Sequence, residues 1–210
     1  AYQFHDSSSN GVLRQASIKG GAKYLQSEGN NLASFLLFLK SNYPDSYRRI
    51  VGSVRMIMPL FGDFYLEPDN GYVSLNWTDN SANDYVFTSD QFSDGTIRFI
   101  ALATLLLQPV ETMPKVIIID EPELGLHPFA ICQLAEMIRD ASLHAQIIVS
   151  TQSAMLVDEF PADCVTVIEN ADGENYTTAR QLNSEQLTDW LEDYALSELW
   201  VKNVIGGQPL

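Results

Sequence analysis

A run of four β-branched residues, Val116–Ile119, constrains the fold of this chain more than any other segment. Pro114 and Pro122 bound the run, and such a continuous apolar segment is typical of a strand buried on both faces of a parallel sheet. The run leads directly into Asp120 and Glu121. These two carboxylates are therefore expected at the carboxyl end of a central strand, the edge at which open α/β sheets bind ligands.

The acidic pair has two interpretations. Phosphoryl transfer needs a carboxylate that binds Mg²⁺, usually through water, and a second group that orients the attacking water. Asp120 would bind the metal and Glu121 would orient the water. A strand that ends in an acidic turn explains the two residues equally well, so the surrounding sequence has to decide.

Strands and helices alternate after residue 94. Helices are predicted over 95–107 and 128–141, with a short one near 153–160, and strands over 116–119, 146–149 and 165–169. A hairpin through Asp172 and Gly173 follows the last strand. Strand–helix–strand alternation implies a parallel sheet with helices packed on it.

The first 90 residues have a different organisation. Apolar residues at helical spacing predict a hairpin of two helices, over 30–39 and from Pro44 to 58. A period of two predicts an antiparallel meander with strands over 64–66, 72–77 and 85–87. We therefore expect a helical lobe with a β meander at 1–90, an α/β core at 91–182, and a helical tail at 183–210.

Further polar segments are expected near the acidic pair. Ser93 is a good N-cap for the helix that follows it, and Gly95 lets a ligand approach the backbone closely. The free N–H groups of such a helix end can bind a terminal phosphate, although an ordinary capped helix explains the same residues. Leu124–His127 then turns the chain into the next helix, and Ser150–Ser153 ends the next strand at the same edge.

The order of these segments resembles the ABC-type ATPase family, and more closely its SMC-like branch of bacterial predicted AAA ATPases and overcoming-lysogeny-type ATPases. In that family a signature of the L-S-G-G-Q kind precedes a Walker B strand, a D-loop and a switch loop. The matching segments here are Phe92–Thr96, Val116–Glu121, Leu124–His127 and Ser150–Ser153, in that order. The resemblance implies the C-terminal part of a P-loop ATPase, an α/β fold with the helical hairpin and the meander placed before the signature helix.

The resemblance also implies a mechanism. Two heads form a head-to-tail homodimer that binds ATP and Mg²⁺ between them, and hydrolysis drives an effector subunit or domain in DNA repair or phage defence. Asp120 would bind the metal, and Glu121 and Gln152 would be catalytic. The nucleotide-contacting residues would be Ser93, Asp94, Gly95, Thr96 and His127. For His127, a place at the start of the next helix is the simpler interpretation.

The sequence departs from the family pattern in one major respect. No phosphate-binding loop of the form G-x-x-x-x-G-K-[S/T], the Walker A motif, occurs in the 210 residues. Gly20–Tyr24 comes nearest, but its spacing is wrong. We expect this motif in an N-terminal half outside the sequence or, as an alternative, in a separate subunit. A non-catalytic module that lends a signature or a dimer surface to a Walker A-bearing partner is the competing hypothesis.

Two smaller departures concern single residues. Gln152 stands where many relatives have a histidine, and it can orient water but cannot change its charge. Asp94 replaces a signature glycine, and a carboxylate near phosphates is unfavourable unless it meets a cation. Arg98, four residues further on, is the candidate cation; a plain surface ion pair is the alternative.

The composition limits the partners and the compartment. The net charge of −15 and the isoelectric point of about 4.3 disfavour unaided binding to nucleic-acid phosphates, so DNA contact is expected only indirectly. Cys132 and Cys164 have no metal-ligand spacing. No apolar run approaches the length of a membrane span, and no signal-peptide pattern is present. We therefore expect a cytoplasmic protein without membrane contact.

Overall fold

The computed structural model describes residues 1–4, 11–20, 23–170 and 176–207. They form two compact units, Ala1–Ser150 and Thr151–Leu210, and each is described by itself. The expected boundaries near residues 90 and 182 stay predictions. No helix within the described ranges has the length and apolar character needed to cross a membrane.

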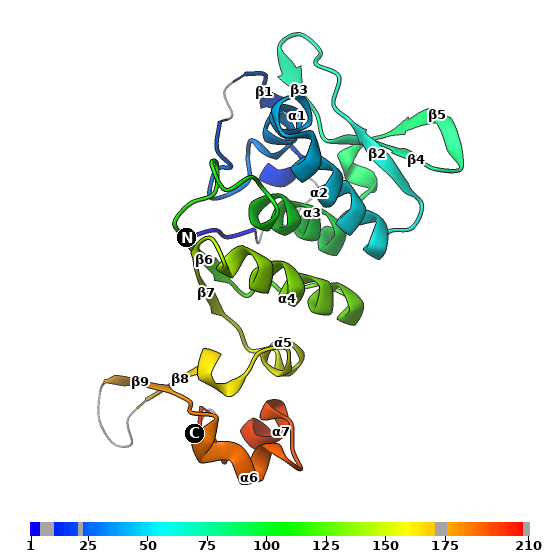
Figure 1. Ribbon diagram of the computed structural model, residues 1–210. Helices are drawn as coiled ribbons and strands as arrows, with labels where there is room; N and C mark the ends of the chain where they lie inside the picture. The colour runs from blue at the N-terminus through cyan, green and yellow to red at the C-terminus, as the bar shows by residue number, and fades with distance from the viewer. Residues whose placement is uncertain (5–10, 21–22, 171–175, 208–210) are drawn as a thin grey trace. The chain divides into compact units, whose positions relative to one another are not determined.

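The predicted helical hairpin is confirmed. Helix α1 (Leu32–Asn42) and helix α2 (Pro44–Ile57) pack against each other, with only Tyr43 between them (Figure 1). Pro44 cannot continue α1, but it suits the first turn of α2, where its missing N–H group costs nothing. Ile50 and Val54 are fully buried, so α2 turns an apolar stripe toward the interior.

The predicted meander is present with a different division of its strands. Strands β2 (Phe61–Tyr65), β4 (Asn76–Asp79) and β5 (Ala82–Phe87) form an antiparallel sheet in the order β2-β4-β5. The single strand expected over 72–77 is wrong. Strand β3 (Tyr72–Val73) pairs instead with β1 (Ser17–Ile18), and the chain turns after it, where the Asn76 N–H donates to the Ser74 carbonyl oxygen at 2.9 Å.

An aromatic stack connects the meander to the segment that precedes Ser93. The ring of Trp77 on β4 stacks on Phe87 of β5 and on Phe92, with ring centroids 4.4 and 5.2 Å away. Phe61 of β2 belongs to the same cluster, with its ring centroid 6.1 Å from that of Trp77 and 6.4 Å from that of Phe92. Phe92 is therefore anchored in the core of the meander, and the start of the next helix is fixed with it.

The α/β core of the first unit is confirmed as the sequence predicts. Helix α3 (Asp94–Leu106) is buried from Ile97 onward and packs against α2 and α4 (Pro128–Ser142). Strands β6 (Val116–Asp120) and β7 (Gln146–Ser150) pair in parallel with Asp120 opposite Ser150. On the other edge of β6, the Tyr2 N–H donates to the Ile118 carbonyl oxygen at 2.7 Å.

The two faces of this parallel pair differ. Ile117 and Ile119 of β6 are buried, whereas Val116 and Ile118 are 50% and 41% exposed, and Ile148 of β7 is 47% exposed. Side chains alternate along a strand, so Asp120 lies on the same face as Val116 and Ile118. An open apolar face therefore leads directly to this carboxylate.

The second unit is a small α+β module. Strands β8 (Thr166–Asn170) and β9 (Thr177–Gln181) pair in antiparallel, so the partner of the strand expected at 165–169 is the hairpin strand and not a parallel neighbour. The expected turn at Asp172 and Gly173 lies outside the described residues. The helices are α5 (Ala154–Asp158), α6 (Thr188–Leu191) and α7 (Leu196–Val201). The core consists of Ala162, Val167, Leu182, Leu196, Leu199 and Ile205.

Candidate active site

The acidic pair lies at the carboxyl end of β6 and is tied to the neighbouring strand. The hydroxyl group of Ser150, at the end of β7, donates a hydrogen bond to Oδ1 of Asp120. The Glu121 N–H donates to the Ser150 carbonyl oxygen at 2.9 Å. One residue of β7 thus holds both acidic residues at the sheet edge where the sequence places them.

The backbone of Glu121 has a left-handed conformation, with a φ of 41°. This region costs a residue with a side chain roughly 1–3 kcal/mol and persists only where neighbouring contacts enforce it. Two turns follow at once, because the Leu124 N–H donates to the Glu121 carbonyl oxygen and the Leu126 N–H to that of Glu123. The loop Glu121–Leu126 is therefore tight, and it sets the direction of the Glu121 side chain.

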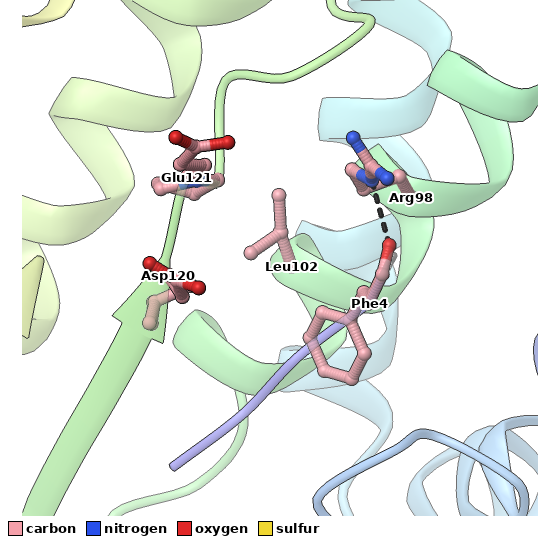
Figure 2. A pocket seen from close by; sticks show the side chains of 7 residues that line it. Phe4, Arg98, Leu102, Asp120 and Glu121 are labelled. Carbon is pink, nitrogen blue, oxygen red and sulfur yellow. Dashed lines mark hydrogen bonds between the residues drawn. The ribbon is translucent and has the colours of Figure 1, made fainter. Parts of the chain in front are cut away.

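A shallow depression with no room for a bound water molecule lies beside the acidic pair. Figure 2 shows Asp120 at the tip of β6, Glu121 in the loop that follows, and Arg98 on α3. The depression is lined by Phe4, Arg98, Leu102, Ile119, Asp120, Glu121 and Pro122. Its wall is thus mainly apolar, with two carboxylates and one guanidinium group as the polar members.

Arg98 joins three segments of the first unit. Its Nε donates to the Phe4 carbonyl oxygen at 2.7 Å, and its Nη1 donates to the Leu124 carbonyl oxygen (Figure 2). Burial lowers the pKa of the Arg98 guanidinium, while the carboxylates of Asp94, Glu121 and Glu123 act in the opposite direction.

The cation that meets Asp94 is not the one expected. The predicted partner was Arg98, but Asp94 forms its ion pair with Arg14, whose Nη2 lies 2.7 Å from Oδ1. Arg14 also donates to the Ser89 carbonyl oxygen. Nothing in the spacing of the sequence indicates this contact, because the two partners are 80 residues apart. The carboxylate of Asp94, the first residue of α3, is therefore neutralised by Arg14.

Ser93 is the N-cap of α3, as the sequence predicts. Its Oγ accepts a hydrogen bond from the Thr96 N–H at 3.1 Å and lies 2.8 Å from the Thr96 hydroxyl oxygen. Ser93 and Asp94 are exposed, and Gly95 and Thr96 are half-buried. The start of this helix is therefore accessible to a ligand or to another protein.

We expect the substitution Ser93→Ala to lower the free energy of unfolding by about 1 kcal/mol, because the Thr96 N–H loses its cap. Urea unfolding of the protein measures this change. Ser41→Ala is the matched control, since the Ser41 hydroxyl donates back to the Leu37 carbonyl oxygen within α1 and caps no helix end. If both variants unfold at the wild-type urea concentration, the Ser93 cap contributes nothing to stability.

The structure explains why residue 95 is a glycine, and the sequence alone does not reveal this reason. A Cβ atom on Gly95 would collide with the carbonyl oxygen of Gly125. The backbone of Gly125 is left-handed, with a φ of 78°. The sequence suggests that Gly95 admits a ligand, but the atom that approaches it in the structure belongs to the loop after β6. The motif pattern gives Gly125 no role of its own, although a glycine in the turn between a strand and a helix is a signal for positive φ.

The remaining predicted site residues have local roles. Nδ1 of His127 accepts from the Phe129 N–H at 3.2 Å, so His127 is the N-cap of α4, the simpler of its two interpretations. Gln152 is exposed in the second unit, before α5. There the Thr151 hydroxyl oxygen accepts from the Ser153 N–H at 2.9 Å, and Ser153 caps α5. The nucleotide contacts of His127 and Gln152 stay predictions.

The donor set suits a magnesium ion that is shared with a phosphate ligand. Among the described residues, no group of three or more His, Cys, Asp or Glu side chains could hold a metal ion. Mg²⁺ is commonly bound by one or two carboxylates, with water and substrate phosphates as the other ligands. Asp120 with the adjacent Ser150 hydroxyl fits that pattern. In Gly20–Tyr24, Gly21 and Ala22 lie outside the described residues.

The fold belongs to the class of P-loop ATPase heads. One similar solved structure comes from work on ATP-driven dimerization and DNA-stimulated activation of SMC ATPases (18% identity, TM-score 0.53, covering 75% of this chain and 94% of that one). Another is the Smc head domain from Pyrococcus furiosus bound to the C-terminal domain of ScpA (17% identity, TM-score 0.54, covering 76% of this chain and 40% of that one). A third is an Smc head bound to the C-winged helix domain of ScpA (16% identity, TM-score 0.55, covering 80% of this chain and 53% of that one). The matched region thus spans 40% of the length of the second structure and 53% of the length of the third.

Residues 28–158 match the family described as "AAA domain, putative AbiEii toxin, Type IV TA system". The chain belongs to this family. No curated protein matches the sequence. The family and the fold are those of nucleotide-binding ATPases, as the order of the signature and Walker B segments predicts.

Proposed function

We propose that this chain supplies the metal-binding and catalytic carboxylates of a head-to-tail dimeric ATPase that uses ATP and Mg²⁺. The observation that carries the proposal is the placement of Asp120 and Glu121. They end one parallel strand together, both tied to Ser150, and a tight loop fixes the backbone of Glu121. Paired carboxylates at this edge are what phosphoryl transfer to water requires.

Each residue has a separate part in the proposed reaction. Asp120, aligned by the Ser150 hydroxyl, would hold the metal ion, and the ion when bound would supply positive charge to the phosphates. Glu121 accepts a hydrogen bond from the attacking water and orients it. Ser93, Gly95 and Thr96 offer the start of α3 to the nucleotide of the partner subunit.

The open face of the parallel pair supports a further part of the proposal. Parallel sheets are normally covered on both faces, yet Val116, Ile118 and Ile148 are exposed on the face that carries Asp120. We place the Walker A segment on this face, where its lysine and amide groups would lie next to Asp120. DNA repair or phage defence is the process that the ATPase would drive, with DNA contacted only through an effector.

The experiment is a complementation test on the protein of the intact reading frame. Ser93→Arg blocks the surface given to the partner, and Glu121→Gln removes the water-orienting carboxylate. Each variant alone should not hydrolyse ATP. Co-expressed in equal amounts, they should recover about a quarter of wild-type turnover, because half of the dimers are mixed and each mixed dimer keeps one complete site.

The matched control combines Ser93→Arg with the double variant Ser93→Arg/Glu121→Gln, a pair that cannot form a complete site and should stay inactive. Recovery in the control, or none in the test, contradicts a site shared between two heads. A wild-type protein that hydrolyses no ATP but binds a Walker A-bearing partner would favour the non-catalytic alternative.

A further inference from the structure

We propose that Arg98 is a positioning residue that holds the loop Glu121–Leu126 against α3 and so fixes the direction of the Glu121 side chain. The inference rests on the proposed function, because it assigns a purpose to the direction of Glu121. Arg98 itself need not contact the nucleotide.

The contacts of Arg98 give the first argument. Its guanidinium group donates to the carbonyl oxygens of Phe4 and Leu124, two residues from distant parts of the sequence. The side chain comes from α3, the helix that begins with Asp94. A guanidinium group carries several donors in one rigid plane, so it can join two acceptors that a single ammonium group cannot hold in the same way. Arg98 therefore connects the helix, the loop and the N-terminal segment.

The backbone of the loop gives the second argument. Glu121 has a left-handed backbone, which is maintained only if the ends of the loop are held. One end is held by the hydrogen bond from the Glu121 N–H to the Ser150 carbonyl oxygen. The other end is held by Arg98 at Leu124 and by the close approach of Gly125 to Gly95. Without Arg98, that end keeps the two turn hydrogen bonds of the loop and the contact between the two glycines, but it loses the side chain that joins it to α3.

The charges give the third argument. Arg98 is only 7% exposed, and the Glu121 and Glu123 carboxylates lie close enough to act on its charge. Both Arg98 and Glu121 line the same small depression (Figure 2). The arginine thus attracts the carboxylate that it positions, and its loss would change both the loop and the local field.

The experiment compares Arg98→Met and Arg98→Lys with wild type in the intact protein. We expect kcat to fall by roughly ten- to a hundredfold, since small displacements of a reacting group have effects of this size. KM for ATP should change by less than about threefold, because binding is largely retained. Arg98→Lys should restore little, because lysine cannot join both carbonyl oxygens. Arg49→Met is the matched control, since Arg49 forms an exposed ion pair with Asp140 away from the site.

A double-mutant cycle separates positioning from a purely structural role. If Arg98 acts through Glu121, Arg98→Met should cause no further loss of turnover in the Glu121→Gln background. An equal loss in both backgrounds, or a change in KM alone, overturns the inference. If Glu121→Gln retains full turnover or wild type has none, it is the proposed function that fails.

Discussion

Replacing Glu121 with Gln in the intact protein should lower ATP turnover by roughly 10²- to 10⁴-fold, the usual contribution of a positioned general base. Gln has nearly the shape of Glu, so the loop and the Ser150 contact are kept, but the amide cannot take a proton from water. ATP binding should survive, and the variant should accumulate as an ATP-bound dimer. Steady-state hydrolysis and size-exclusion chromatography with ATP measure the two effects.

Glu136→Gln is the control for this substitution. Glu136 is an exposed residue of α4, within hydrogen-bonding distance of Gln133 of the same helix. Its replacement by Gln removes the same negative charge outside the site. Its turnover should equal that of wild type. Unchanged hydrolysis in Glu121→Gln would show that another residue activates the water.

Gly95→Ala should have the largest effect on stability, lowering the free energy of unfolding by roughly 1–3 kcal/mol through overpacking. The new Cβ would collide with the Gly125 carbonyl oxygen, a backbone atom that cannot move aside as a flexible side chain would. The loop after β6 or the start of α3 must shift, so turnover should fall as well. Urea unfolding and steady-state hydrolysis report the two losses.

Gly52→Ala tests the same replacement where there is space. Gly52 lies within α2, and nothing lies within 4 Å of the position of an added Cβ. Alanine there should raise stability by about 0.5–1 kcal/mol, since it is the better helix former. Opposite signs for the two glycines would support the close contact at Gly95. Equal changes would show that Gly95 is not confined.

The elements that the sequence predicts well are those with a strong local signal. Pro44 separates two helices of clear apolar period, and the β-branched run before Asp120, bounded by two prolines, favours a strand. The strands of the meander are harder to predict, because a single alternating segment, 72–77, is divided between two sheets. Alternation predicts an extended chain, but it does not tell which strand the chain pairs with.

The candidate site was predicted at the level of its segments and not of its contacts. Asp120, Ser93 and His127 lie where the pattern places them, as a strand end and two helix caps. The contacts from Arg14 to Asp94 and from Arg98 to Leu124 join residues far apart in the sequence. Such pairs depend on tertiary packing, for which the local pattern carries no signal.

The aromatic stack around Trp77 has a consequence for how the head can respond to forces from outside. Phe92 is part of that stack and is followed directly by Ser93. A tilt of the three-stranded sheet must therefore be transmitted to the first turn of α3, because closely packed rings cannot slide without opening a void. A protein that binds the exposed side of the sheet could therefore move the first turn of α3, the proposed nucleotide-contacting segment, without touching the nucleotide itself.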